Sequence, residues 1–502
     1  MRCSNFLDSS VKSFQLSDIA RKIPNAMDGL IPVRRKVIEC ARRTGLSKKM
    51  KVFQLGGRVA DVMRYHHGGA SIEGAITHMM QRFYTANVFP LLISHGQEGS
   101  IREGGEDKAA SRYLDCTLNK PLTDALYNER DDNLLKYVLE DGERVDPANY
   151  VPCLPMSILE WYQIPGTGWK SSIVARQKEF VIENIKRLIT NDNAELLAMP
   201  PTRDGFTGAW YVDAEHAHTT REIATGAWTY NADNNALIIT ELPPRVWTSR
   251  FVKKLQEHYE DVVITEFIDD KTSADNNRTH IVIPLRNGAM ETIYARGATQ
   301  FDPVTEFFGL YDYYDSYLNF TDDSGRLIAF DSYESVLKYW FNARKMLYIA
   351  RSTRENTLTK LRILVIENKL KFIANHKTYS LSNLEYAEQD EILTKNRYLR
   401  CDEHVINNPG SIATELIENE ALRGTGAGYD YLLTLSYRRM SEKHVTELQK
   451  ELEKLRNYLN YLANYGEFPG AQMWREEISQ VVKLFVSGIA KNEDEDIEFI
   501  DG

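Results

Sequence analysis

The most constraining feature of this sequence is one long stretch without a helix breaker. Residues 333–376 contain neither Gly nor Pro, the two residues that most strongly interrupt helices, over more than forty positions. An average helix has only about 11–12 residues. We therefore expect this stretch to form one helix that leaves the globular body as an arm.

A second segment has the pattern expected of a partner for that helix. In residues 441–466 the apolar side chains follow the 3-4-3-4-3 spacing of a coiled-coil seam. The two runs together predict an antiparallel two-helix arm, with residues 377–440 as a helical knob at its tip. Two unrelated amphipathic helices in a bundle are the alternative. The seam consists of Val445, Leu448, Leu452, Leu455, Leu459 and Leu462.

The rest of the chain predicts a mixture of helices and strands. Residues 15–120 suggest short helices, with an N-cap at Ser17, a break at Pro24 and a new helix near Pro32. Two further helices flank "HHGG", which is typical of a helix-turn-helix or winged-helix module. Alternating patterns between residues 235 and 330 predict strands at "NALIITEL", "DVVITEFIDD", "THIVIPLR" and "RLIAFD". The predicted class is a multidomain α+β protein.

The composition narrows the class of protein further. Hydrophobic residues make up 43% of 502 residues, an ordinary globular balance, and no apolar run reaches the ~18 residues of a membrane span. The five cysteines are scattered and form no CxxC pair, which disfavours a zinc site and favours a reducing compartment.

The charge is unevenly distributed. Residues 1–120 hold 19 Lys and Arg against 11 Asp and Glu, a net charge of +8. Since the whole chain carries −10, the remainder carries −18. Such asymmetry predicts a localised anion-binding face in the N-terminal part, although solvated faces distributed by chance are the alternative.

Three stretches in this basic part could hold a phosphate. "DGLIPVRRKVI" places Arg34, Arg35 and Lys36 near a helix start, where cations and backbone N–H groups can bind an anion. "RYHHGG" places His66 and His67 at a junction of helices. "GQEGSIREGGEDKAASRY" is a glycine-rich run that ends in Arg-Tyr. Each pattern is common when it occurs alone.

Together and in this order, these stretches resemble the DNA breakage–reunion region of type IIA DNA topoisomerases. The resemblance runs from about Gln15 to about Ser487. It implies a winged-helix DNA-cleavage domain, an α/β tower, and a long antiparallel coiled-coil arm with a helical dimerisation knob. The matching segments are "IPNAMDGLIPVRRKVI", "KVFQLGGRVADVMRYHHG", "LLISHGQEGSIREGGEDKAASRYLDC", "YVPCLPMSIL…GTGW", "PPTRDGFTG" and "IITELPPRVWT".

The resemblance also implies domain boundaries. The expected order is a cleavage domain (1–130), a tower domain (131–332), an outgoing helix (333–376), a C-gate knob (377–440), a returning helix (441–466), and a C-terminal helix with an acidic tail (467–502).

The resemblance implies roles for individual residues. Tyr113 stands where the family tyrosine attacks DNA, and Arg112 precedes it. His67 and Arg35 match residues that contact the scissile phosphate. Relatives bend DNA with an isoleucine wedge directly before Gly-Thr-Gly-Trp, where this chain has Pro165, with Ile164 one position earlier. The remaining predicted DNA contacts are Arg34, Lys36, Arg58, His66 and Lys170.

The chemistry of a tyrosine nucleophile fits these neighbours. A phenol oxygen can displace the deoxyribose 3′-oxygen from phosphorus and leave a 5′-phosphotyrosyl bond, so one phosphodiester is exchanged for another ester. The ordinary phenol pKa is about 10, so reaction at neutral pH needs a proton acceptor or a cationic neighbour. Arg112 can stabilise the charge on the phosphoryl oxygens.

Partners and cofactors are implied by the resemblance as well. We recognise no Toprim domain or ATPase loop, since "FIDDKTSADNN" and "EDED" lack the right context. Mg²⁺ and ATP are therefore expected on a partner Toprim/ATPase subunit, beside double-stranded DNA and a homodimer formed through the C-gate. The local motifs are closest to eukaryotic, large-virus and T-even-like phage enzymes, so we expect a cytoplasmic location, in a phage-infected bacterial cell.

The alternative to an enzyme is an architectural DNA-binding dimer of the same fold that has lost cleavage. A gyrase-type subunit that introduces supercoils is disfavoured, because we recognise no DNA-wrapping domain. The expected activity is strand passage for relaxation or decatenation.

Overall fold

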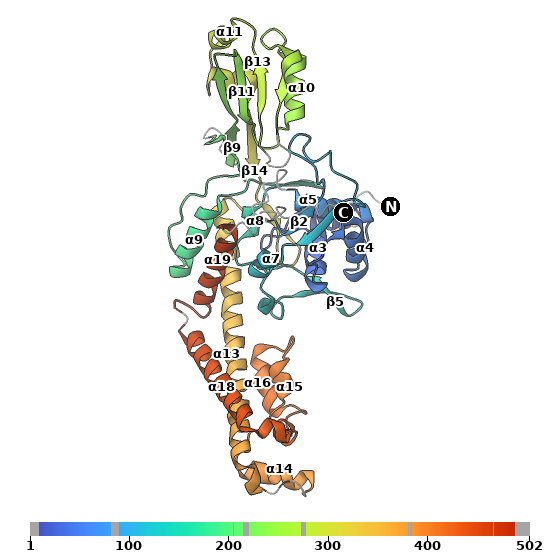
Figure 1. Cartoon of the computed structure of the whole chain (residues 1–502), viewed down its shortest axis with the longest axis vertical. Helices are drawn as coiled ribbons and strands as arrows, with labels where there is room; N and C mark the ends of the chain where they lie inside the picture. The colour runs from blue at the N-terminus through green and yellow to red at the C-terminus, as the bar shows by residue number, and fades with distance from the viewer. Residues whose placement is uncertain are drawn as a thin grey trace, which may run out of the picture. The chain divides into compact units, whose positions relative to one another are not determined.

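A computed structural model describes most of the chain, and it divides the chain into two compact units (Figure 1). Unit 1 comprises residues 1–128, 135–342 and 478–502, and unit 2 comprises residues 129–134 and 343–477. The described residues are 10–81, 90–203, 205–213, 220–272, 278–379, 381, 384–464 and 466–486. The predicted acidic tail and "EDED" lie outside them.

Unit 1 begins with the expected short helices. They are α2 (Lys12–Lys22), α3 (Pro32–Arg43), α4 (Val52–Val62) and α5 (Gly69–Met80). The break at Pro24, the helix start at Pro32 and the two helices around "HHGG" are confirmed. The N-cap at Ser17 is wrong, because α2 already begins at Lys12 and the Ser17 carbonyl accepts a hydrogen bond from Arg21 Nε.

A small antiparallel sheet completes this winged-helix region. Its order is β1-β3-β2, with β1 at Met50–Lys51, β2 at Leu92–His95 and β3 at Asp115–Leu118. Helix α3 packs on α4 and α5. The apolar faces of the three helices bury Val37, Ile38, Leu55, Val59, Ile72 and Ile76.

Two β-hairpins and three helices follow in unit 1. The helices are α7 (Lys120–Leu126), α8 (Met156–Leu159) and α9 (Lys178–Thr190), and the first hairpin pairs β4 (Tyr137–Glu140) with β5 (Glu143–Pro147). The second hairpin pairs β6 (Tyr162–Gly166) with β7 (Trp169–Ile173). Its two-residue turn is Thr167–Gly168, and Gly168 has a φ of 79°, which favours glycine.

The remainder of unit 1 contains two larger sheets (Figure 1) and a two-stranded sheet of β15 and β16. One has the order β14-β9-β8 and the other β10-β11-β13-β12. The second sheet packs with α10 over a core that includes Leu237, Ile239, Phe251, Leu255 and Ile283. The strands and helices are β8 (Ala209–Val212), β9 (Thr220–Thr225), β10 (Ala227–Asn231), β11 (Ala236–Glu241), α10 (Thr248–His258), β12 (Asp269–Asp270), β13 (Ile281–Pro284), α11 (Ala289–Arg296), α12 (Pro303–Phe308), β14 (Tyr311–Ser316), β15 (Asn319–Thr321) and β16 (Leu327–Ala329).

Three of the four predicted strands are present, within "NALIITEL", "THIVIPLR" and "RLIAFD". The strand predicted over "DVVITEFIDD" is wrong except for Asp269–Asp270. Within this segment the consecutive residues Val262 and Val263 are both buried, so the segment does not alternate as a strand does. The 3-10 turn η3 (Thr265–Phe267) follows instead.

Unit 2 contains most of the predicted long helix, α13 (Tyr333–Tyr379), whose first turns up to Asn342 belong to unit 1. Helix α18 (Glu442–Ala463) runs beside it in the opposite direction, because Arg456 Nη2 donates to Glu367 whereas Tyr458, further along α18, donates to the earlier Glu355. The predicted antiparallel arm is therefore confirmed. Leu448 of the heptad seam is in the shared core, and Val445, Leu452 and Leu455 pack against it.

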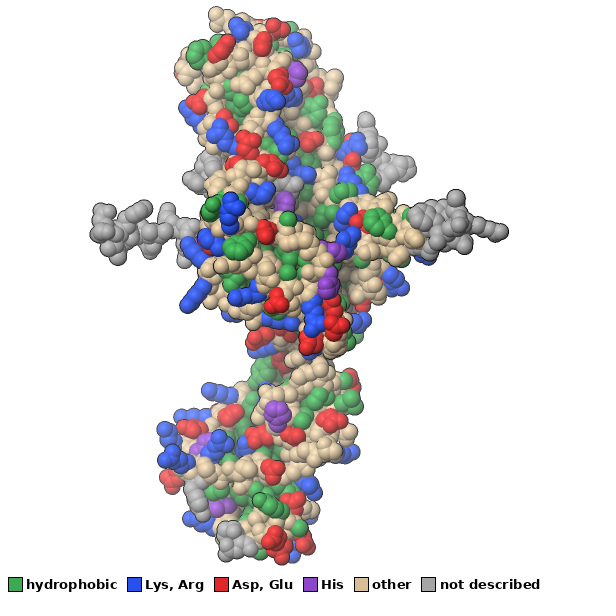
Figure 2. Space-filling model, turned by 90° about the vertical axis from the view of Figure 1, so that its right-hand side faces the viewer, with side chains coloured by type: hydrophobic (Ala, Val, Ile, Leu, Met, Phe, Trp, Pro, Cys, Tyr) green, Lys and Arg blue, Asp and Glu red, His purple; other side chains and the backbone are tan. Residues whose placement is uncertain are grey.

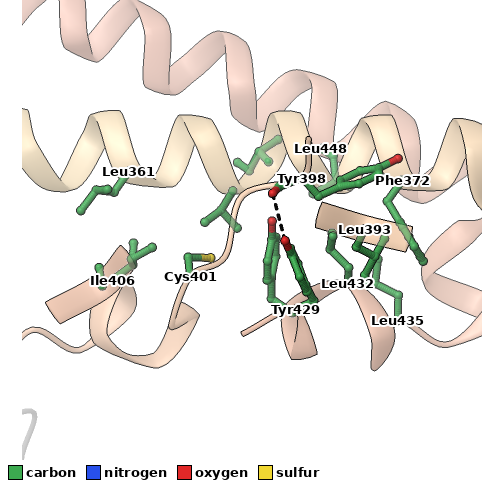
Figure 3. Packing of buried hydrophobic residues seen from close by; sticks show 14 of the residues in the cluster. Leu361, Phe372, Leu393, Tyr398, Cys401, Ile406, Tyr429, Leu432, Leu435 and Leu448 are labelled. Atoms are coloured by element: carbon green, nitrogen blue, oxygen red, sulfur yellow. Dashed lines mark hydrogen bonds between the residues drawn. The ribbon is translucent and has the colours of Figure 1, made fainter. Parts of the chain in front are cut away.

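Short helices connect the two arm helices along the chain and pack against α13. They are α14 (Tyr386–Lys395), α15 (Glu403–Asn407), α16 (Thr414–Arg423), α17 (Asp430–Leu433) and the 3-10 turn η5 (Tyr437–Met440). Figure 3 shows their apolar side chains, including Leu393, Ile406 and Leu432, gathered under Leu361 and Phe372 of α13. In the same cluster, the Tyr429 hydroxyl donates to the Tyr398 carbonyl at 3.4 Å.

A buried ionic cluster ties the separate pieces of unit 2 together. Asp131, from the 3-10 turn η2 (Glu129–Asp131), accepts from Arg344 at 2.6 Å and from Arg351 at 3.1 Å. The same two arginines bind Glu477 of α19 (Ala471–Val486). Since breaking a buried ion pair leaves an uncompensated charge, this cluster fixes η2 on α13.

Candidate active site

Tyr113 lies on an exposed turn just before β3. Its backbone N–H donates to the Ala110 carbonyl at 2.8 Å, and the residue is 66% exposed. Within the described parts of the chain, its hydroxyl has no hydrogen-bond partner. The Arg112 guanidinium lies over the ring, with Cζ 4.9 Å from the ring centroid. The phenol is therefore open to a substrate and has a cation beside it.

The turn is fastened to the helices of the winged-helix region. Val52, the first residue of α4, donates its N–H to the Leu114 carbonyl at 2.8 Å. Ser111 Oγ donates to Glu73 of α5 at 2.5 Å. Since α5 begins just after the two histidines, the turn with Arg112 and Tyr113 is tied to the helix that follows His67.

The glycine-rich run is a compact loop that requires its glycines. A Cβ on Gly99 would lie 2.6 Å from the Gly105 Cα, and both residues have positive φ values of 105° and 84°. Asp107 closes the loop by accepting from the N–H and the Oγ of Ser100 at 2.8 and 2.6 Å. The loop therefore has a defined shape that leads into the turn of Tyr113.

The two histidines lie at the exposed junction of α4 and α5. His66 Nε2 donates to the Glu140 carboxylate of β4, and this hydrogen bond lowers the pKa of Glu140. The His67 ring meets Tyr65 edge-on at 5.2 Å between centroids and is exposed to solvent. The His66 Nε2 atom is thus occupied by Glu140, whereas the contact of His67 with Tyr65 is between aromatic rings and leaves the His67 nitrogens accessible.

The environments of Arg35 and Lys36 are at odds with their predicted contacts to DNA. Arg35 is only 5% exposed, and its Nε and Nη2 donate to Asp28 at 2.7 and 3.0 Å. Lys36 Nζ donates to the Met63 carbonyl and to Asp146, both at 2.8 Å. A phosphate could reach either side chain only after these bonds break. Both residues are structural in this conformation.

The neighbouring arginines are more accessible. Arg34, in the first turn of α3, is half-buried and lines a small, half-open pocket of about 30 Å³. Arg58 is exposed on α4. On the face of the protein in Figure 2, Lys and Arg side chains are interspersed with Asp and Glu, so the cations do not form one continuous patch there.

The hairpin β6–β7 separates the two predicted wedge residues. Pro165 pairs with Lys170 and Ile164 pairs with Ser171, so Pro165 and Ile164 lie on opposite faces. Pro165 is exposed and Ile164 is half-buried. Asp18 of α2 holds the hairpin turn by accepting from the N–H and the Oγ1 of Thr167 at 3.0 and 2.8 Å.

Two features of this hairpin concern the predicted contacts. Lys170 Nζ lies 5.1 Å from the Tyr317 ring centroid and lines a polar cleft of about 410 Å³. Trp169, 45% exposed next to the turn, is an apolar side chain that was not among the residues predicted to contact DNA. The sequence did contain a clue to this residue, because Trp169 is the last residue of the "GTGW" motif.

Other matched segments prove to be packing elements. Arg203 of "PPTRDGFTG" donates to Glu241 of "IITELPPRVWT" at 3.0 Å, and the Thr207 N–H donates to the same carboxylate at 3.2 Å. Both Arg203 and Glu241 are buried. These two segments thus hold each other in place.

Within the described ranges, no three His, Cys, Asp or Glu side chains gather as a metal site. None of the described helices combines the length and the apolar character needed to cross a membrane.

Comparison with known protein families shows to which family the chain belongs. A family profile for the A subunit of DNA gyrase/topoisomerase IV matches residues 21–479. The chain belongs to this family. The suspected resemblance to type II DNA topoisomerases is confirmed, and the profile covers α3 to α5, the turn of Tyr113 and both arm helices.

Individual topoisomerases are similar over almost the whole chain. DNA topoisomerase 2 of African swine fever virus is 29% identical over 97% of this chain, and that of Arabidopsis thaliana is 27% identical over 90%. The chain spans 42% of the viral protein and 31% of the plant protein. A crystal structure of the Plasmodium falciparum topoisomerase II DNA-binding, cleavage and re-ligation domain has a TM-score of 0.78 at 26% identity, covering 97% of this chain and 64% of that one.

The structural match includes the features that carry this topoisomerase fold, namely the winged-helix region, the tower sheets and the arm.

Proposed function

We propose that this chain is the DNA-cleaving part of an ATP-dependent type IIA topoisomerase, with Tyr113 as its nucleophile. The observation that carries the proposal is the exposed Tyr113 ring under the Arg112 guanidinium, on a turn fastened to a helix-turn-helix. In a member of the DNA gyrase/topoisomerase IV family, an accessible phenol with a cation over its ring supports the role of a nucleophile that attacks DNA.

The proposed reaction exchanges one phosphate ester for another. The Tyr113 oxygen forms a bond to phosphorus, and the bond from phosphorus to the deoxyribose 3′-oxygen breaks. The phenol proton is released, and the leaving 3′-oxygen takes up a proton. Reversal reseals the strand without a net change in ester bonds, so the break is transient.

Arg112 and His67 have complementary tasks in this proposal. The Arg112 guanidinium, which is always charged, stabilises the negative charge that develops on the phosphoryl oxygens. His67, exposed ahead of α5, donates a hydrogen bond to the same phosphate. Arg34 and Arg58 hold the neighbouring backbone phosphates, which fixes the register without reading the sequence.

We further propose that Mg²⁺ and ATP are bound by a Toprim/ATPase partner. This proposal is supported by the resemblance to type IIA enzymes, because the viral relative is much longer than the region that this chain matches. The bound metal supplies charge stabilisation at the phosphate. The cytoplasm, including that of a phage-infected bacterium, stays the predicted location.

We also propose that two copies associate through the knob, residues 377–440, so that two Tyr113 residues cut opposite strands. Two large side chains on the knob are strongly exposed, Tyr386 and Leu416. Leu416→Arg is expected to shift the chain towards the monomer in sedimentation velocity. Met346→Arg is the matched control, since Met346 is also apolar and strongly exposed but lies outside the knob. Equal effects of both variants would contradict a C-gate at this surface.

The nucleophile is tested by Tyr113→Phe in the complex with the Toprim/ATPase partner, Mg²⁺ and an end-labelled duplex. Denaturant added during the reaction traps protein on DNA. The parent is expected to form a covalent adduct and Tyr113→Phe to form none, while both bind DNA equally. Tyr294→Phe is the control, because Tyr294 is an exposed tyrosine in the tower.

The architectural alternative makes a different prediction for the same experiment. A DNA-binding dimer without chemistry binds the duplex and yields no adduct with any variant, the parent included. An adduct that persists in Tyr113→Phe would instead assign the chemistry to another residue.

A further inference from the structure

The glycine-rich loop that leads to Tyr113 rests against a residue far along the chain. The Trp247 indole lies so close to Gly104 that a Cβ on Gly104 would be 2.3 Å from its Cε2 and Nε1 atoms. Trp247 and Ile101 form a small buried cluster of their own, separate from the larger cores. Any side chain at position 104 would therefore push the loop away from the tower.

Polar contacts surround this apolar one. The N–H and Oγ of Ser249, in the first turn of α10, donate to the Arg102 carbonyl at 3.2 and 2.9 Å. Ser249 Oγ also approaches a Glu103 carboxylate oxygen at 2.9 Å. The Arg102 side chain forms an ion pair with Asp270 of β12 at 3.2 Å. The loop is thus held by α10 and by the sheet beside it.

The backbone before Trp247 is shaped to present the indole. Arg245 has a φ of 71°, in the left-handed region that a non-glycine residue adopts only when its surroundings enforce it. The Val246 N–H donates to the Pro243 carbonyl at 3.0 Å, and the Tyr314 hydroxyl donates to the Pro244 carbonyl at 2.6 Å. The strained turn is therefore fixed at both ends.

The other side of the loop connects directly to the nucleophile. Ala109 donates its N–H to the Gln97 carbonyl at 2.8 Å and so closes the base of the loop. Ala110, the next residue, accepts the hydrogen bond from the Tyr113 N–H. The hydrogen-bonded base of the loop that contains Gly104 thus lies directly next to the turn of Tyr113 in the chain.

We propose that Trp247 is a positioning residue for Tyr113. By filling the space that Gly104 leaves open, the indole holds the loop of residues 97–112 against the tower and keeps Arg112 and Tyr113 in the geometry for attack. The tower and the nucleophile then move as one. This inference rests on the proposed function of Tyr113, but the contact itself can be tested without it.

The first measurement is hydrogen exchange of the full chain, read at the amides of Gly105 and Ala109, both of which are bonded within the loop. In Trp247→Ala, exchange at these amides is expected to become on the order of tenfold faster, because the loop opens locally. Trp247→Phe restores part of the contact and part of the protection. Ser249→Ala, a milder change on the same surface, gives a smaller increase.

A matched control separates loop positioning from general loss of tower stability. Trp228→Phe changes another tower tryptophan, which packs on the core of the four-stranded sheet and donates to Thr305 Oγ1 at 3.2 Å. It is expected to leave the exchange at Gly105 and Ala109 unchanged. If Trp247→Ala fails to fold, Trp247→Phe and Ser249→Ala decide the question.

The second measurement is the rate of covalent adduct formation in the complex with the partner, at saturating DNA. Trp247→Ala is expected to slow the adduct step while DNA affinity is kept, and Trp247→Phe to recover most of the rate. Unchanged loop exchange in Trp247→Ala overturns the proposal, and so does faster loop exchange with an unchanged adduct rate. Absence of any adduct in the parent overturns the proposed function instead, while the exchange result still decides whether Trp247 holds the loop.

Discussion

The Arg112 guanidinium covers one face of the Tyr113 ring at 4.9 Å. Both side chains are exposed, so this cation–π contact contributes only about 0.5–1 kcal/mol to stability. Its consequence is chemical. A permanent positive charge is held over the ring of a phenol whose reaction with phosphate produces negative charge.

Arg112→Ala is expected to slow adduct formation by about 10²–10³-fold, the usual effect of removing one group that stabilises charge in the transition state. Stability should change by less than about 0.5 kcal/mol, because the side chain is exposed. Arg112→Lys should recover only part of the rate, since an ammonium lacks the planar donors of a guanidinium. Single-turnover cleavage in the complex measures the effect.

Arg58→Ala is the control for that experiment. Arg58 is also exposed, but it lies on α4 and is predicted to contact only the DNA backbone. We expect weaker binding, a salt slope smaller by about one, and an unchanged cleavage rate at saturating DNA. A similar loss of rate in both variants would argue against a special role for Arg112.

Arg35→Ala is expected to destabilise unit 1 by about 3–5 kcal/mol, because it leaves the buried Asp28 carboxylate without its ion-pair partner. Urea unfolding measures this loss. Arg34→Ala, the change at the neighbouring and more accessible arginine, should affect stability little and DNA affinity more. If Arg35→Ala were as stable as the parent and lacked only cleavage, Arg35 would have the catalytic role that the resemblance implies.

The long helix and the arm could be predicted from the sequence because their signals are local. The absence of Gly and Pro from residues 333–376 and the heptad seam from Val445 to Leu462 depend only on neighbours along the chain. The same holds for the helix boundaries at Pro24 and Pro32. The position of Tyr113 followed from a motif rather than from any physical pattern.

The accessibility of each cation could not be predicted, since it depends on distant partners. In "VRRK" the three cations look alike, yet Lys36 is bonded to Asp146, which is 110 residues away. The contact of Trp247 with Gly104 is likewise set by tertiary packing. Local patterns do not contain such pairings, which is why Arg35 and Lys36 were expected to be free to bind DNA.

The pH dependence of stability should contain a contribution from Glu306. Backbone N–H groups of Gln300, Phe301 and Thr299 donate to its carboxylate and lower its pKa from the ordinary value of 4.5 to about 2. The unfolded chain therefore binds the proton first as the pH falls. The stabilisation is fully present above about pH 4.5 and is lost as the pH falls towards 2.

Glu306→Gln tests this contribution. We expect the parent to melt at a higher temperature than Glu306→Gln at pH 6, and the difference to shrink steadily between pH 4.5 and the lowest pH at which both variants fold. Glu291→Gln, at an exposed glutamate of α11, is the control. A difference that does not depend on pH would mean that the Glu306 side chain acts through its shape rather than its charge.

The hairpin β6–β7 should bend DNA through Pro165 rather than Ile164. Pro165 is exposed beside the turn, whereas Ile164 points to the opposite, half-buried face, and Asp18 restrains the turn against rotation. A wedge unstacks a base step at a cost of a few kcal/mol, so bending should favour flexible pyrimidine–purine steps. The stiff proline ring suits this task because it loses no rotamer freedom on insertion.

End-to-end distance in a doubly labelled duplex measures the bend. Pro165→Ala is expected to lengthen this distance at saturating protein, Ile164→Ala to leave it nearly unchanged, and the double variant to match Pro165→Ala. Trp169→Ala tests the second exposed apolar side chain of the hairpin, and Gln163→Ala, on the same face as Pro165, is the control. If the double variant bends DNA as strongly as the parent while Trp169→Ala does not, the wedge is Trp169. If all five variants bend DNA as strongly as the parent, the hairpin is a rigid turn tied to α2 and the bend arises elsewhere in the tower.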